Sequence, residues 1–254
     1  MNAYDIVRAS REKGRPTAQK YIDEMVEGFI ELHGDRRFAD DAAIIGGIGR
    51  MGGRPVTVIG IEKGADTKSK VARNFGCAHP EGYRKAVRLM QQAEKFHRPV
   101  LCLVDTSGAY CGIGAEERGQ SEAIATAIFD MIRLKTPALT LIIGEGGSGG
   151  ALGLSPPPEG LVTETSSSSA LSPPGGAPLF WKDATKVARA AECLKMTAPD
   201  LIRLGAVERV IPEQGFSPDF YVGLKAQIVS FFEEKSRIPA ADLVEARYAR
   251  FRKF

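Results

Sequence analysis

Short apolar runs and segments of helical periodicity alternate along most of this chain. The runs are rich in β-branched residues and too short for helices, so they predict strands of a sheet. In the other segments apolar residues recur every three or four positions, which is typical of amphipathic helices. We expect strands at residues 43–48, 56–61, 100–104, 139–143 and 207–211. We expect helices at residues 17–32, 83–96, 116–134, 181–196, 199–204, 216–235 and 240–254.

The order of a strand, a glycine-containing loop and a helix occurs twice in succession, over residues 100–134 and 139–152. This order predicts an α/β fold with a largely parallel sheet. The first loop reads DTSGAYCGIGA and the second reads GEGGSGG. Because parallel strands place their carboxyl ends at one edge of a sheet, we expect the two loops to meet there, where α/β folds bind ligands.

The second loop lies in the segment ALTLIIGEGGSGGALGL, residues 138–154. Its glycines allow positive φ angles and a close approach of another molecule to the main chain. A strand, a glycine-rich turn and the start of a helix bring free backbone N–H groups to one point. Such a point can hold a phosphate or an oxyanion. Tight packing without any ligand is the alternative interpretation of the same glycines.

Gly144, Gly146 and Gly149 also satisfy the G-x-G-x-x-G pattern of dinucleotide-binding folds, and Glu164 follows at about the spacing of a ribose ligand. We favour this interpretation less, because the prolines at positions 156, 157 and 158 leave room only for a short helix after the turn. A Walker phosphate loop is excluded, because no Gly-Lys-Ser/Thr follows.

Composition narrows the class of protein. The chain has 254 residues, 43% of them hydrophobic, which is enough for one large domain. Its net charge of +3 suits an anionic substrate and does not indicate nucleic-acid binding. We expect a cytoplasmic protein, since no apolar run approaches a membrane span and the N-terminus lacks the apolar core of a signal peptide. The four cysteines form no C-x-x-C pair, so we expect no metal site in this chain.

Four stretches carry a resemblance to a known family. They read GDRRFADDAAIIGGIG, RNFGCAHPEGYRKAVRLMQQAEKF, DTSGAYCGIGAEERGQSEAIA and IGEGGSGGALGL. Together they resemble the alpha-subunit family of bacterial acetyl-CoA carboxylase carboxyltransferases. The likeness runs over residues 16–154 and resumes at 179–213. Several long motifs match in order, which is much more specific than one glycine-rich loop.

The resemblance implies a crotonase-like (ClpP/crotonase) fold of repeated β-β-α units with flanking helices. It implies an α2β2 assembly with a carboxyltransferase beta subunit, which supplies the zinc and most of the coenzyme A site. The implied cofactor is biotin, held on the biotin carboxyl carrier protein and carboxylated by an ATP-dependent biotin carboxylase. The alpha–beta pair then transfers the carboxyl group to acetyl-CoA, and the product is malonyl-CoA, in the first committed step of fatty-acid synthesis.

The resemblance also implies site residues. Gly149 and Gly150 are the expected catalytic residues, whose backbone N–H groups face an oxyanion on the biotin side. No protein acid–base pair is required if the biotin anion takes the methyl proton of acetyl-CoA. The residues that we expect to bind substrate are Gly146, Gly147, Gly108, Ala109, Tyr110 and Arg73. For Arg73, a surface ion pair is the alternative.

We expect a single domain over residues 1–254, with a helical lead-in at 1–32, a crotonase-like core at 33–213 and C-terminal helices at 214–254. The segment SPPPEGLVTETSSSSALSPPGGAP, residues 155–178, departs from the family, because Pro174 stands where a Ser-Pro-Glu-Gly turn has glutamate. Its prolines and serines are typical of low-complexity sequence. A flexible insertion and misassigned residue identities are the two explanations, and no functional residue is carried over from this segment.

Two other functions stay open from the sequence. A stand-alone crotonase-type acyl-CoA hydratase or isomerase needs a carboxylate acid–base pair, for which Glu116, Glu117 and Glu145 are the candidates near the loops. A non-catalytic scaffold subunit needs no site of its own, and would tolerate Gly149→Val without loss of carboxyl transfer.

Overall fold

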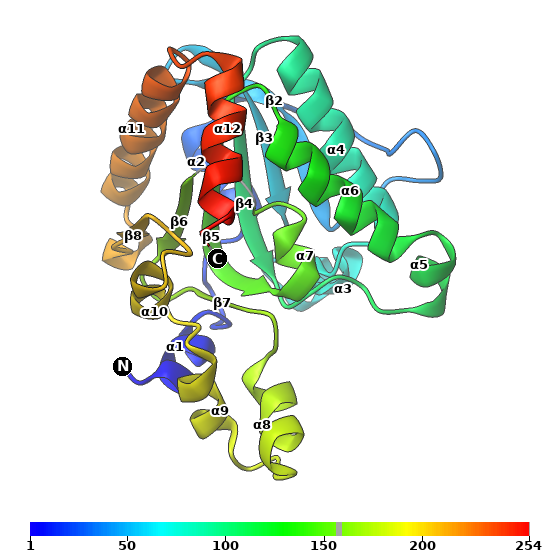
Figure 1. Ribbon diagram of the computed structural model, residues 1–254, viewed down its shortest axis with the longest axis vertical. Coiled ribbons are helices and arrows are strands. Elements are labelled where there is room, and N and C mark those ends of the chain that lie inside the picture. Colours follow the sequence, from blue (N-terminus) through cyan, green and yellow to red (C-terminus); the bar gives the residue numbers. More distant parts are fainter. Residues whose placement is uncertain (156–158, 254) are drawn as a thin grey trace.

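One mixed sheet forms the centre of the fold (Figure 1). The computed structural model describes residues 1–155 and 159–253. The strands are β1 (Glu27–Glu31), β2 (Ile44–Met51), β3 (Arg54–Ile61), β4 (Val100–Thr106), β5 (Ala138–Gly147), β6 (Glu159–Thr163), β7 (Ser167–Ser169) and β8 (Arg209–Ile211). Their order is β1-β2-β3-β4-β5-β6-β8, and β7 pairs with the end of β5. The pairs β1–β2 and β2–β3 are antiparallel, and all other neighbours are parallel.

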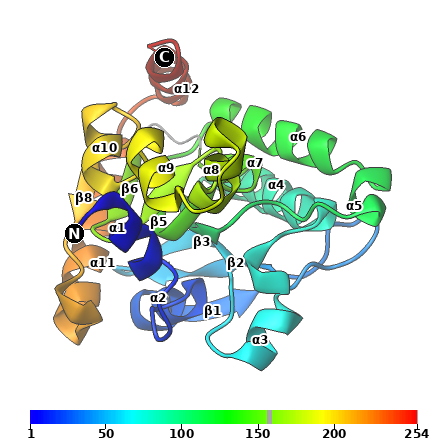
Figure 2. The same cartoon turned by 90° about the horizontal axis from the view of Figure 1, so that it is seen from below.

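Helices cover both faces of this sheet, as the view in Figure 2 shows. The helices are α1 (Ala3–Ala9), α2 (Ala18–Met25), α3 (Thr67–Ala72), α4 (Pro80–Lys95), α5 (Ile113–Glu117), α6 (Gln120–Arg133), α7 (Ser148–Leu152), α8 (Pro173–Trp181), α9 (Val187–Leu194), α10 (Ala198–Arg203), α11 (Pro218–Lys235) and α12 (Ala240–Phe251), with short 3-10 turns η1 (Asn74–Gly76) and η2 (Gln214–Phe216). Helices α4, α6, α7 and α10 pack on one face, and α2 and α11 pack on the other. None of the described helices is both long and apolar enough to cross a membrane.

The central strands are buried on both faces, which explains their continuous apolar runs. Every residue of β4 is buried. Its Cys102 and Val104 belong to the core under α4 and α6, whereas Leu101 and Leu103 belong to the core under α2 and α11. Each such side chain contributes roughly 1.5–3 kcal/mol by leaving water. The sheet is therefore most firmly fixed at β4 and β5, the two strands that lead into the predicted loops.

Most of the predicted elements are confirmed. The runs at residues 43–48 and 56–61 form the hairpin β2–β3, which turns at Gly52 and Gly53 with φ angles of +58° and +77°. The strands predicted at 100–104, 139–143 and 207–211 are β4, β5 and β8, and the helices predicted at 83–96, 199–204, 216–235 and 240–254 are α4, α10, α11 and α12.

The helix predicted at residues 17–32 is wrong in its second half. Helix α2 ends at Met25, and the chain continues as β1, so the lead-in at 1–32 is not wholly helical. β1 pairs with β2 at a point where β2 carries Gly47. A Cβ at Gly47 would lie 2.2 Å from the carbonyl oxygen of Ile30, so the glycine makes this close pairing possible. Tertiary contact overrides the helical periodicity here.

Two longer predicted helices are interrupted. Gly119, with a φ of +81°, separates α5 from α6 within the helix predicted at residues 116–134. The helix predicted at 181–196 is shortened to α9, because α8 ends at Trp181 and Lys182 adopts a left-handed φ of +52°. Local left-handed backbone ends a helix whatever the apolar pattern beyond it.

Residues 155–178 form ordered elements wherever the structure describes them. Leu161 and Val162 of β6 are buried, one in each core, and β7 pairs with Glu145–Gly147 of β5. Ser172 caps α8 by accepting a hydrogen bond from the N–H of Gly175. The explanation as a flexible insertion is therefore wrong for β6, β7 and α8. The prolines at 156, 157 and 158 lie outside the described residues.

A buried arginine ties the C-terminal helix α12 to the end of α6. Arg247 has no exposed surface, and its Nη1 donates to the carbonyl oxygens of Met131, Ile132 and Leu134 at 2.7–3.0 Å. These carbonyls belong to the end of α6, which has no intrahelical donors left for them. Burial lowers the pKa of Arg247 to about 10, so the group still carries its charge at neutral pH.

We predict that Arg247→Met lowers the free energy of unfolding by about 3 kcal/mol, because it leaves several buried carbonyl groups without a donor. Denaturant titration followed by circular dichroism measures the loss. Arg252→Met on the same helix is the control, and we expect it to change stability by less than about 0.5 kcal/mol, since Arg252 is exposed. Equal stability of the two variants would contradict this account of α12.

Candidate functional site

The two predicted loops meet at the carboxyl ends of β4 and β5, as expected. The strands run parallel from Val100 opposite Ala138 to Thr106 opposite Gly146. A Cβ at Gly150 would lie 2.5 Å from the backbone nitrogen of Ala109, and one at Gly147 would lie 2.3 Å from the carbonyl group of Ser107. Main chain therefore packs directly on main chain, and only glycine fits at these two positions.

The glycine-rich turn predicted at residues 144–150 begins later than expected. β5 continues as a strand to Gly147, so its glycines serve close approach rather than positive φ angles. A Cβ at Gly144 would lie 2.5 Å from the carboxylate of Asp105. The left-handed residue of the turn is Ser148, with a φ of +50°. This strained conformation at a non-glycine residue marks the point where the strand changes into α7.

The turn presents backbone donors that the protein does not use. The N–H groups of Gly149 and Gly150 lie in the first turn of α7, where a helix offers no acceptor. Across residues 1–155 and 159–253, neither group donates a hydrogen bond to another residue. Gly149 is half-buried and Gly150 is buried. Adjacent donors that are fixed and partly withdrawn from water can stabilise an oxyanion.

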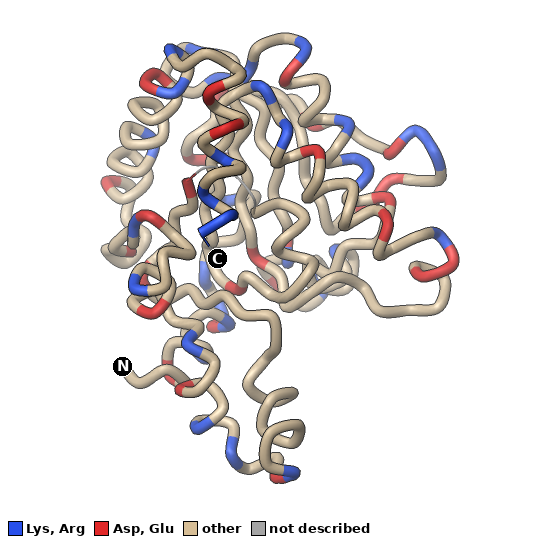
Figure 3. Tube along the Cα trace, viewed as in Figure 1, with Lys and Arg blue, Asp and Glu red and all other residues tan. Residues whose placement is uncertain are grey.

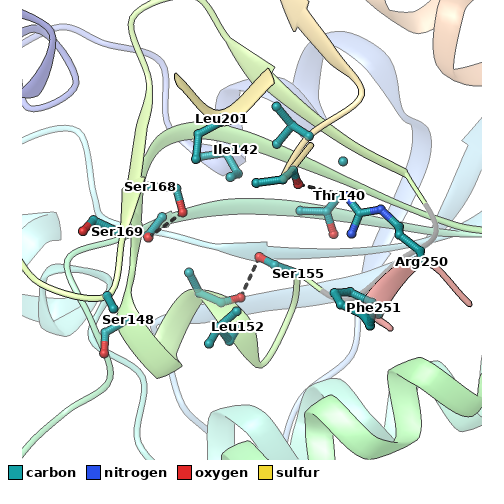
Figure 4. Close-up of a pocket in the computed structure, with 16 residues that line it drawn as sticks. Thr140, Ile142, Ser148, Leu152, Ser155, Ser168, Ser169, Leu201, Arg250 and Phe251 are labelled. Atoms are coloured by element: carbon teal, nitrogen blue, oxygen red, sulfur yellow. Dashed lines mark hydrogen bonds between the residues drawn. The ribbon is translucent and has the colours of Figure 1, made fainter. Parts of the chain in front are cut away.

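A cavity of about 350 Å³ lies beside α7 and the end of β5. Figure 4 shows it extending from Ser148, Ser168 and Ser169 at one end to Arg250 and Phe251 at the other. The lining residues are Thr140, Ile142, Gly146, Ser148, Ala151, Leu152, Ser155, Gly160, Ser168, Ser169, Ala170, Leu201, Ala206, Val207, Arg250 and Phe251.

The walls of this cavity are mainly apolar, because several of its polar side chains are already bonded to the protein. The Ser168 hydroxyl donates to the carbonyl of Gly146 at 3.0 Å, and the Ser155 hydroxyl donates to that of Ala151 at 2.7 Å. Arg250 is paired with Glu208 at 2.8 Å. The cavity therefore suits an apolar ring or acyl group whose polar end lies toward α7.

A buried ionic network lies at the same edge of the sheet. The Lys63 Nζ, just after β3, contacts Asp105 Oδ1 of β4 at 2.7 Å and Glu145 Oε2 of β5 at 2.6 Å. The N–H of Glu145 donates to Asp105 at 2.9 Å, and Arg11 contacts Glu145 Oε1 at 2.7 Å. Two cations and two anions thus join the ends of three neighbouring strands directly before the loops.

The charges of this network support one another. Burial alone would raise the pKa of Glu145, but the Lys63 ammonium and then the Arg11 guanidinium outweigh it and hold that pKa below its usual range. Burial would lower the pKa of Lys63, but Asp105 and Glu145 raise it above its usual value. Both groups are therefore charged at neutral pH, and Glu145 is an ion-pair partner rather than a proton donor.

The predicted substrate-binding residues divide into two groups. Gly146, Gly147, Gly108 and Ala109 lie at the junction of the two loops. Tyr110 instead stacks on His79, with ring centroids 4.2 Å apart, and Arg73 donates from Nη1 to the carbonyl of Ala42 at 2.8 Å. Of all the predicted site residues, Gly146 alone lines the cavity beside α7, as far as the described residues define it.

Sequence reasoning missed the network and the far end of the cavity. Asp105 and Glu145 each come just after a predicted strand. From this position alone, we could have predicted that the two carboxylates lie close together at one edge of the sheet. Lys63 follows the strand predicted at residues 56–61 in the same way. No sequence pattern predicted that Arg250 and Phe251 line the cavity, because they reach it from the C-terminal helix, far along the chain from the two loops.

Solved structures confirm the predicted α/β crotonase-like fold. A transcarboxylase 12S structure with methylmalonyl-coenzyme A and methylmalonic acid bound superposes with a TM-score of 0.73 at 15% identity, over 93% of this chain and 45% of that chain. The beta subunit of P. aeruginosa geranyl-CoA carboxylase gives 0.70 at 16% identity, over 94% of this chain and 46% of that chain. The chain thus spans about half the length of these structures, and at such identities they show the fold alone.

Sequence relatives match over nearly the full length. An acetyl-coenzyme A carboxylase carboxyl transferase subunit alpha of Ruminiclostridium cellulolyticum is 52% identical over 100% of this chain and 98% of its own. The subunit of the same name from Bacillus cytotoxicus is 49% identical over 100% of this chain and 80% of its own. Residues 1–254 match the family described as acetyl co-enzyme A carboxylase carboxyltransferase-like. The chain therefore belongs to the acetyl-coenzyme A carboxylase carboxyl transferase alpha-subunit family, as its sequence motifs predicted.

Proposed function

We propose that the turn at Gly149 and Gly150 is the oxyanion-binding part of a carboxyl-transfer site that this chain shares with a beta subunit. Family membership assigns the chain to carboxyl transfer in acetyl-CoA carboxylase. The observation that carries the residue assignment is the pair of unused N–H donors beside an apolar cavity. Relatives are named alpha subunits, which supports a beta-subunit partner. The carrier protein, the biotin carboxylase and a cytoplasmic location belong to the same proposal.

The residues present fit biotin, the cofactor that the family implies. Its fused rings are apolar apart from the ureido group, whose oxygen is a strong hydrogen-bond acceptor. Ile142, Leu152 and Leu201 provide apolar walls. Gly149 and Gly150 do not line the cavity themselves, but they lie on α7 between Ser148 and Ala151, which do. When bound, the carboxylated cofactor supplies the activated carboxyl group.

The task of this chain's own residues is to hold negative charge. The donors of Gly149 and Gly150 stay fixed because Gly150 packs on the backbone of Gly108 and Ala109. A fixed donor needs no reorganisation as charge develops, and one such donor is worth about 2.7–4 kcal/mol of the barrier. Gly150 is buried and Gly149 is half-buried, which limits the access of water to these donors.

The hydratase alternative lacks a proton donor in the described part of the chain. Glu116 and Glu117 are exposed on α5, and Glu145 is held as an anion by Lys63 and Arg11. None of the three lines the cavity beside α7. A carboxylate that is ion-paired on both oxygens cannot deliver a proton at neutral pH. Hydration of an enoyl-CoA by this chain alone would revive the alternative.

We predict that biotin carboxylation from malonyl-CoA, the reverse reaction, requires both subunits. The chain should be inactive alone and active when mixed with a beta subunit, because it supplies oxyanion donors but not most of the coenzyme A site. The measurement is malonyl-CoA consumption with free biotin. Activity of the chain alone would place the coenzyme A site here and overturn the shared site. Inactivity in the mixture, with assembly shown by gel filtration, would favour the scaffold alternative.

We predict that Gly150→Ala lowers kcat in the assembled enzyme by about 100-fold or more, since its Cβ would displace the donors from the backbone of Ala109. Gly149→Ala is the matched control. Its Cβ meets only the methyl groups of Ile124, the nearest at 3.7 Å, so we expect a much smaller loss. Gly149→Val should block the approach to the turn and lose activity without loss of assembly. Full activity of Gly149→Val would favour the scaffold alternative.

We predict that Glu145→Gln lowers the free energy of unfolding at pH 7 by roughly 3 kcal/mol, because it breaks a buried ion pair. The folded pKa of Glu145 lies below its ordinary value of 4.5. The stabilisation of the folded state by ionised Glu145 is therefore present above pH 4.5 and is lost as the pH falls below that value. Denaturant titrations from pH 7 to pH 3 should show a shallower decline for the variant. Glu233→Gln, at an exposed ion pair, is the control and should follow the unmodified chain.

A further inference from the structure

Three arginines gather where the loop between β1 and β2 meets α4. Arg36 and Arg37 lie in the loop and Arg88 lies on α4. In Figure 3 this loop projects from the body, with a blue stretch flanked by red ones. All three line a cavity of about 380 Å³ between the loop, α4 and α6. This cavity shares no lining residue with the one beside α7.

Two of the guanidinium groups converge on a single oxygen atom. Arg36 donates from Nη1 to the carbonyl of His33 at 2.8 Å, and Arg88 donates from Nη2 to the same carbonyl at 3.3 Å. Arg88 also donates from Nε to the carbonyl of Gly34 at 3.1 Å. The carbonyl oxygen of His33 thus holds the two positive guanidinium groups close together. The N–H groups of Arg36 and Arg88 that do not bond these carbonyls are left for another acceptor.

The nearby carboxylates are engaged with other groups. The Oδ1 of Asp35 accepts hydrogen bonds from the backbone N–H groups of residues 37–39. Its Oδ2 pairs with Arg84 at 2.7 Å. Asp40 pairs with Lys85 at 2.6 Å and also accepts from His33. Within the described ranges, neither Arg36, Arg37 nor Arg88 has a carboxylate within ion-pair distance. Glu122 also lines the cavity, where it is exposed at the start of α6.

Arg88 is half-buried, whereas Arg36 and Arg37 are exposed. Burial, and then the charge of Arg36, lower the pKa of Arg88, while Asp40 and Asp35 oppose that effect. Arg36 also has a left-handed φ of +66°, a conformation that residues other than glycine rarely adopt. The turn made by Asp35 fixes this conformation, so the loop presents its arginines in a defined position.

We propose that Arg36, Arg37 and Arg88 form an anion site that binds a phosphoryl group, in a cavity separate from the one beside α7. Guanidinium groups are planar, stay charged, and bind phosphate oxygens in pairs, which lysine does not do. The three arginines carry more positive charge than the single free carboxylate of Glu122 can balance. A phosphoryl dianion supplies the missing charge and accepts several N–H groups at once.

The phosphoryl group has two possible sources, free inorganic phosphates and the phosphates of coenzyme A. The probes are therefore pyrophosphate, coenzyme A and dephospho-coenzyme A, each titrated into the full chain by calorimetry at about 0.15 M ionic strength, where screening limits unspecific attraction. We expect pyrophosphate to bind with a Kd below about 1 mM. Weaker binding of dephospho-coenzyme A than of coenzyme A would assign the site to the substrate's 3′-phosphate, and equal binding would assign it to free phosphates.

Arg37→Gln is the sharpest variant, because the Arg37 side chain makes no hydrogen bond to another described residue and its loss removes charge alone. We expect it to raise the Kd about tenfold or more, as for the loss of one charge-assisted contact. Arg88→Lys should also weaken binding, since lysine keeps the charge but not the paired geometry. Arg133→Gln is the control, an exposed arginine on α6 that lies over Phe129, and it should leave the Kd unchanged. No binding of pyrophosphate at about 10 mM, or an unchanged Kd in Arg37→Gln, would overturn the proposal.

Discussion

The fold and the site both depend on balanced charge inside the ionic network of Lys63, Asp105, Glu145 and Arg11. Each charge taken from water costs several kcal/mol, which is recovered only when the partners are well placed. Lys63 lies between the two carboxylates at 2.6 and 2.7 Å, so it fixes the ends of β4 and β5 relative to β3. Because the ends of β4 and β5 are fixed, the loops that follow these strands are also held at a fixed distance from each other. Donors that must not move during a reaction are thus held by groups that take no part in it.

Close packing of the neighbouring strand and its loop explains the glycines at the end of β5 and the start of α7. Asp105 and the main chain of its loop lie so close to the neighbouring strand that a Cβ at Gly144, Gly147 or Gly150 would meet them at 2.3–2.5 Å. These glycines are thus required by packing, whereas the one left-handed residue of the turn is Ser148. A glycine-rich segment can therefore be a strand whose neighbour approaches closely, and the motif alone does not distinguish this from a turn.

The sequence predicts what depends on local pattern and fails where distant segments decide. The apolar runs at 100–104 and 139–143 are buried on both faces, so they identified β4, β5 and the meeting point of their loops. The second half of the helix predicted at 17–32 forms β1 instead. It does so because Gly47 of β2, which has no side chain, allows the two strands to pair closely. Likewise, Arg11 and Arg250 reach the site from opposite ends of the chain. No spacing in the sequence relates them to Gly149 and Gly150.

The state of the charges also limits the chemistry of the site. Glu145, which precedes the turn on β5, is paired with a cation on each carboxylate oxygen. The turn itself offers backbone N–H groups, which bind an anion but do not exchange protons. These N–H groups can stabilise negative charge, and none of the three candidate carboxylates lines the cavity beside them to move a proton. Any proton that is transferred must therefore pass between the reactants or to a group from outside this chain, and this agrees with a site that is completed by a partner.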